Sequence, residues 1–137
     1  MALSMIYTVN ATNTAFTTED GEFVQVPFGS VVRRKNKGIV LDGGGLVGMG
    51  SGYYDFDVSL TVSPTAIGAI RAQLFQDGTP VTGATATGYA AAAGNQLTLS
   101  FPAVARQCGC CCNTVFTVGI NASATVNNLA VVAKKTE

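Results

Sequence analysis

All four cysteines of the chain lie within five positions, at Cys108, Cys110, Cys111 and Cys112 in RQCGCCCNT, and the chain has no histidine. A reactive thiolate needs a base or a cation beside it, and only Arg106 is close in sequence. Four adjacent thiols also make a poor zinc site, because consecutive strand residues point to opposite faces. Three roles stay open: free thiols that pack as small apolar groups, disulfides within or between chains, and a metal shared between copies.

Two carboxylates, Asp55 and Asp57, alternate along one predicted strand and would lie roughly 7 Å apart on the same face. That separation is near the one used by retaining glycosidases, which also need a cleft and two different environments for the acids. Ser59 and Thr61 continue the same face, so we interpret it as a solvated strand face. A calcium site would need further oxygen ligands. We therefore assign no catalytic residue and predict that the chain is not an enzyme.

The run GGGLVG at 43–48 satisfies the dinucleotide-binding pattern G-x-G-x-x-G. That mechanism needs a helix directly after the glycines, whose N-terminus holds the pyrophosphate. Here an alternating strand pattern follows instead, after MGSG. We expect a loop or a close backbone approach at these glycines, and no cofactor.

One cluster of charge stands out, formed by Arg33, Arg34, Lys35 and Lys37. Eight basic and eight acidic residues cancel over the whole chain, so no net field attracts nucleic acid or an anionic membrane. A nucleic-acid patch would also be larger and interleaved with aromatic residues. The cluster is typical of a solvated turn that protects a strand end from edge-to-edge pairing. It also suits docking on an acidic surface of a neighbouring protein.

Alternation of apolar and polar residues predicts the elements that position these groups. The clearest strand is GYYDFDVSLTVSP, residues 52–64, and Asp77-Gly78 predicts a tight turn after a strand at 70–75. Asn127-Asn128 predicts a bulge in the last strand. Further strands are expected at 22–26, 30–34, 38–42, 84–91, 95–101, 114–120 and 123–133. One all-β domain of about eight to ten antiparallel strands follows, with the jelly roll as the commonest arrangement at this length.

The N-terminal residues have neither the basic nor the long apolar segment of a signal peptide, and no run is long enough to span a membrane. We therefore expect synthesis in the host cytoplasm without export. Apolar residues make up 47% of the chain and charged residues only 12%, which suits a subunit that covers much of its surface with copies of itself.

The strand GYYDFDVSLTV and the following AQLFQDGTPV resemble trimeric jelly rolls of the tumour-necrosis-factor and complement type. The order of TVSPTA, the Asp-Gly turn, a GAT-rich segment, the cysteine run and TVNNLAVVAKK over residues 52–133 is also similar to small jelly-roll proteins of bacteriophages and gut bacteria. The resemblance implies a homotrimer. We assign its interface to the strand that carries Tyr53, Tyr54 and Phe56, and to three residues facing away from their expected cores: Phe75, Phe116 and Val118.

The resemblance also implies a role on the surface of a virion, as a trimeric protein that decorates the phage head or forms a short fibre on it. Residues 1–30 are then an attachment arm and residues 31–137 the jelly-roll domain, with the basic cluster docking on other capsid proteins. The alternative is a carbohydrate- or receptor-binding module that recognises a host-surface glycan through its end loops. Neither hypothesis requires a cofactor, nucleic acid or a membrane.

Overall fold

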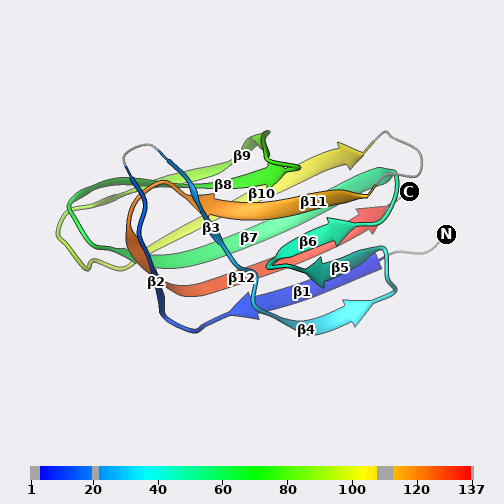
Figure 1. The fold of residues 1–137 in the computed structure, drawn as a ribbon, viewed down its shortest axis with the longest axis horizontal. Helices are drawn as coiled ribbons and strands as arrows, with labels where there is room; N and C mark the ends of the chain where they lie inside the picture. Colours follow the sequence, from blue (N-terminus) through cyan, green and yellow to red (C-terminus); the bar gives the residue numbers. More distant parts are fainter. Residues whose placement is uncertain (1–3, 20–21, 108–112, 137) are drawn as a thin grey trace.

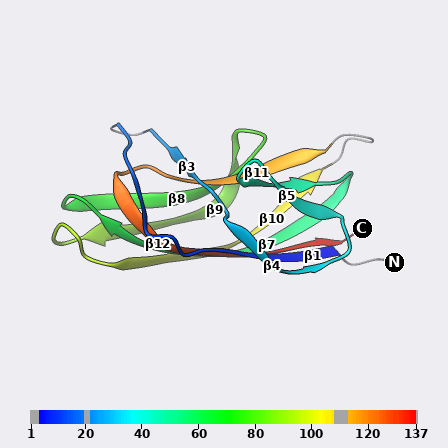
Figure 2. The same ribbon diagram turned by 60° about the horizontal axis from the view of Figure 1, so that its bottom comes forward.

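The computed structural model describes residues 4–19, 22–107 and 113–136, with the side chain of residue 136 left aside. These residues form two antiparallel β-sheets that face each other (Figures 1 and 2). The described residues contain no helix, and hence none that could cross a membrane. The all-β prediction is confirmed.

Each sheet contains six strands. In the first, sheet A, the strand order is β10 (Leu97–Gln107), β7 (Gly52–Pro64), β12 (Ala124–Thr136), β1 (Ser4–Asn10) and β4 (Ser30–Lys35), and β2 (Thr14–Phe16) also pairs with β12. In the second, sheet B, the order is β5 (Ile39–Asp42), β6 (Gly45–Gly48), β11 (Thr114–Ile120), β8 (Gly68–Gln76) and β9 (Thr79–Ala90), and β3 (Val24–Val26) also pairs with β11.

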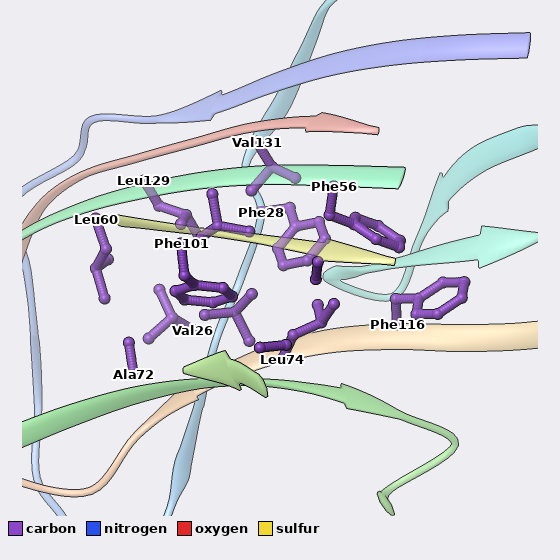
Figure 3. Close-up of a cluster of buried hydrophobic side chains, with 14 of the residues drawn as sticks. Val26, Phe28, Phe56, Leu60, Ala72, Leu74, Phe101, Phe116, Leu129 and Val131 are labelled. Atoms are coloured by element: carbon purple, nitrogen blue, oxygen red, sulfur yellow. The ribbon is translucent and has the colours of Figure 1, made fainter. Parts of the chain in front are cut away.

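The core lies between the two sheets and follows from the period-two pattern of their strands. Along β7 every second side chain from Tyr54 to Val62 is buried, while Tyr53, Asp55 and Asp57 are exposed. Figure 3 shows side chains of both sheets meeting in this layer, and the Phe56 and Phe116 rings lie 4.6 Å apart between centroids. Aromatic contacts of this kind add to the stabilisation from apolar burial.

Several local predictions are confirmed. Strands β7 and β11 have the predicted bounds, and the pairing of β12 with β7 shifts register between Val126 and Asn128, as expected of a bulge. Asp77 and Gly78 connect β8 to β9 with positive φ angles of 51° and 82°. A two-residue hairpin turn with both φ angles positive matches the right-handed twist of the flanking strands.

The predicted division at residue 30 is wrong, because the N-terminal segment belongs to the sandwich. Strand β1 lies between β12 and β4 within sheet A and pairs with Lys135 through Leu129 of β12. Strands β2 and β3 then extend sheets A and B in turn. Residues 4–19 and 22–30 are therefore part of the same folded unit as the rest of the chain.

Candidate assembly surface

The outer face of sheet A is a continuous surface that no other described element covers (Figure 2). Pairing registers place Pro102, Asp57, Val132, Tyr7 and Arg33 side by side in one row across five strands. We define the outer face of sheet A by this row and its two neighbouring rows. The next row consists of Ser100, Ser59, Ala130, Val9 and Ser30, and the row on the other side of Val104, Asp55, Lys134, Met5 and Lys35.

A shallow groove of about 560 Å³ runs across the middle of this face. Its polar lining consists of Asp57, Ser59 and Ser100, whereas Tyr7, Phe101, Pro102, Ala130, Val132 and Val58 supply mainly carbon surface. The short side chains of Ser59 and Ala130 lie next to larger neighbours, which leaves the hollow. A groove with this lining is suited to accept an apolar side chain from another protein surface.

A second hollow of about 330 Å³ adjoins the groove and contains Asp55, Asp57 and Lys134. Lys134 is in register with Asp55 on the neighbouring strand, so opposite charges are adjacent across the sheet. Both aspartates are exposed on the face, as the interpretation of a solvated strand predicted. The described residues contain no group of three or more potential metal ligands.

Four of the predicted interface residues are not on the surface. Tyr54, Phe56, Phe116 and Val118 are buried between the two sheets within a single chain, so they cannot contact a second copy. The prediction placed Phe116 and Val118 on the outer face of β11. A strand has only one inward face, and these two residues occupy it.

The other two predicted interface residues lie on opposite outer faces. Tyr53 is 48% exposed on sheet A, where the Arg106 guanidinium lies 5.5 Å from its ring centroid. Phe75 is on the outer face of sheet B and meets Phe23 edge to face, with centroids 5.2 Å apart. The structure therefore does not bring the predicted interface residues together.

The glycine run forms a turn and a close approach to an aromatic ring, as expected of these glycines. Gly43 and Gly44 form the turn between β5 and β6 with φ angles of 61° and 80°. A Cβ atom at Gly48 would lie 2.6 Å from the ring of Tyr54, so only glycine lets β6 approach that ring. Tyr54 donates a hydrogen bond to the carbonyl of Gly50 at 2.6 Å, and burial raises the pKa of its phenol.

The basic cluster is at an edge of sheet A. Arg33, Arg34 and Lys35 belong to β4, whose residues are all exposed, and Lys37 lies in the connection to β5. The predicted protection of a strand edge is consistent with this position. Docking on a capsid protein stays a prediction. The cysteines at 108, 110, 111 and 112 lie outside the described residues.

Sequence reasoning missed the residues that define the groove, above all Tyr7 and Val132. The signal was present in SMIYTVN, where Ser4, Ile6, Thr8 and Asn10 are buried and the residues between them face outward. This alternation is that of a half-buried strand. The expectation of an extended arm over residues 1–30 left this strand out.

No protein-family model matches the sequence, and no curated protein matches it. Solved structures do match it in three dimensions. Murine APRIL aligns with a TM-score of 0.72 at 12% identity and covers 98% of this chain and 100% of its own. The fold is a TNF-like jelly roll.

Two further jelly rolls show the range of proteins with this fold. The globular domain of zebrafish complement 1qA protein aligns with a TM-score of 0.59 at 14% identity, covering 96% of this chain and 94% of its own. PRD1 vertex protein P5 aligns with a TM-score of 0.58 at 12% identity, covering 97% of this chain and 72% of its own. At these identities the jelly roll itself is what the proteins share.

Proposed function

We propose that the protein is a structural component of a bacteriophage virion without catalytic activity, built as a homotrimer through the groove on the central strands of the outer face of sheet A. It decorates the capsid surface or forms a short head fibre. The observation that carries the proposal is the apolar groove around Tyr7, Pro102 and Val132, which spans the central strands of a sheet and is uncovered in the single chain. Burial against copies of the chain would remove this surface from water.

The fold supports a trimer of this type. TNF-like jelly rolls, which the sequence resembles, assemble as homotrimers. The structural similarity to a phage vertex protein is consistent with a place on a virion. The groove contains no residue of β4, which lies at the margin of sheet A. In this arrangement the basic edge formed by Arg33, Arg34, Lys35 and Lys37 therefore remains available to attach the trimer to other virion proteins.

A matched pair of variants tests the assembly. Val132→Lys puts a charge into the groove on sheet A, whereas Val115→Lys makes the same change on the outer face of sheet B, where Val115 is 40% exposed. Burying an unpaired charge in an interface is costly, so we expect Val132→Lys to give folded monomers and Val115→Lys to keep the parent assembly. Sedimentation velocity measures the state, and circular dichroism checks folding. An unchanged assembly in Val132→Lys would place the interface elsewhere.

The virion role has its own test. Peptides of the chain should be found by mass spectrometry in purified phage particles, and a tagged chain should label the capsid surface. Absence of the chain from particles would refute the virion role. Saturable binding to a glycan array that end-loop variants abolish would support the carbohydrate-binding alternative.

A further inference from the structure

Strand β4 is an open edge of sheet A. All six residues from Ser30 to Lys35 are exposed, and β1 is the only strand that pairs with β4 in the described part of the chain. Figure 1 shows β4 at the margin of the sheet, beside β1 and away from the central strands. A strand with one unpaired side presents backbone N–H and C=O groups that another extended segment can pair with.

We propose that this edge captures an extended acidic segment of another virion protein, which adds to sheet A as a further strand. Main-chain hydrogen bonds of the added strand supply affinity in this mode of recognition, and its alternating side chains supply specificity. The inference rests on the proposed attachment to other virion proteins and specifies the chemistry of the attaching segment.

Charge identifies the occupant. Arg33 and Lys35 are in register with the outward-facing Tyr7 and Met5, so these two cations share the outer face of sheet A. Arg34 is in register with buried Ile6 and extends from the other face of the strand. A segment with carboxylates at every second position would place a row of negative charge beside Arg33 and Lys35.

The same cations act against the most obvious competitor, a second copy of β4. Each β4 strand carries Arg33, Arg34 and Lys35, so the pairing of two copies would gather six cations along one seam, and like charges close together across a strand pair are destabilising. These cations therefore disfavour pairing between two copies of β4 and favour an acidic partner. Val31 and Val32, which are 40% and 47% exposed, offer apolar contact area beside the charges.

The pairing of β4 with β1 also limits the length of the added strand. It shifts register between Tyr7 and Thr8, which marks a bulge at Val32. Positive φ angles at Gly29 (89°) and Asn36 (61°) turn the chain at either end of β4. The regular, basic part of the edge is thus short, and a segment of five or six residues is enough to occupy it.

The test uses a fluorescein-labelled peptide of alternating glutamate and valine, titrated into the full chain and followed by anisotropy. Two control peptides accompany it: one with lysine in place of glutamate, and one with the acidic sequence but N-methylated at every backbone amide, so that neither of its edges can pair. We expect saturable binding of the acidic peptide alone, together with slower amide hydrogen exchange at residues 30–35. Equal binding of the N-methylated peptide would overturn strand addition, because that peptide cannot complete the backbone ladder.

A pair of variants locates the site. Arg33→Glu should weaken peptide binding at least about tenfold, since it replaces an attraction by a repulsion. Arg71→Glu makes the same charge change on β8 of sheet B and should leave binding unchanged. Equal loss in both variants would show general charge attraction and refute the site. The oligomeric state separates this proposal from the proposed trimer. If Arg33→Glu still assembles but does not bind the peptide, capture at β4 is supported. If the parent chain assembles but binds no acidic peptide, capture at β4 is refuted and the trimer is not.

Discussion

Two buried threonines of the sandwich differ in whether their hydroxyl has a hydrogen-bond partner, which makes them a sensitive test of the described core. Both Thr8 in β1 and Thr114 in β11 are 0% exposed. The Thr114 hydroxyl donates a hydrogen bond to the carboxylate of Asp77 at 2.7 Å. The Thr8 hydroxyl has no hydrogen-bond partner among the described residues. Thr8 is in register with Val131 and Val31 of the two neighbouring strands. The same substitution to valine should therefore have opposite effects at the two positions.

An unsatisfied buried hydroxyl costs about 1–3 kcal/mol. Valine has nearly the shape of threonine and leaves no cavity, so Thr8→Val should raise the free energy of unfolding by about 1–2 kcal/mol. For a chain of this length that increase corresponds to a rise in Tm of about 3–7 °C. Thr114→Val removes a hydrogen bond to a carboxylate whose residue is exposed, so we expect a loss of about 1 kcal/mol.

Urea denaturation with reductant present, followed by circular dichroism, measures both variants against the parent chain. The linear-extrapolation slope should stay the same, so that the midpoint reports stability directly. A destabilised Thr8→Val would refute the reasoning, because it would show that the Thr8 hydroxyl has a partner that stabilises the fold. Equal effects in the two variants would refute it as well.

Three further changes test other contacts of the sandwich. Gly48→Ala places a Cβ atom 2.6 Å from the Tyr54 ring and should cost about 1–3 kcal/mol in urea denaturation. The matched Gly88→Ala meets only the flexible ends of two leucine side chains, Leu97 and Leu99, and should cost less than about 1 kcal/mol. Burial raises the pKa of Tyr54, so its neutral phenol stabilises the fold below the ordinary tyrosine pKa of 10.0. This contribution is lost as the pH rises through the folded-state pKa, and Tyr54→Phe should remove that part of the loss of stability at alkaline pH in a pH series of denaturation curves. Asp77→Ala removes the carboxylate that accepts hydrogen bonds from the Thr114 hydroxyl and the Val115 amide, and should lower Tm by about 3–7 °C in a thermal scan.

Strands with strict alternation were predictable from the sequence. Strand β7 has five inward apolar positions in succession, so its bounds and its buried face follow from the period of two. The Asp77-Gly78 turn and the bulge near Asn128 were predictable for the same local reason, since their residue types favour those backbone conformations.

The surfaces were less predictable, because they depend on which strands become neighbours. The row that joins Tyr7 to Val132 and Asp57 brings together residues from three distant parts of the sequence, and only the strand order of sheet A reveals it. Strand β6 was missed because glycines at Gly45 and Gly48 weaken its strand signal, while close approach to neighbouring groups requires them.

The mass of the intact assembly tests the central claim most directly. Native mass spectrometry of the full chain, recorded with and without reductant, should give about 42 kDa, three times the 14.0 kDa of one chain. Persistence of that mass in reductant would show that the trimer does not depend on disulfides. A single species at 14.0 kDa across micromolar concentrations would contradict the account, because the groove on sheet A would then remain in water.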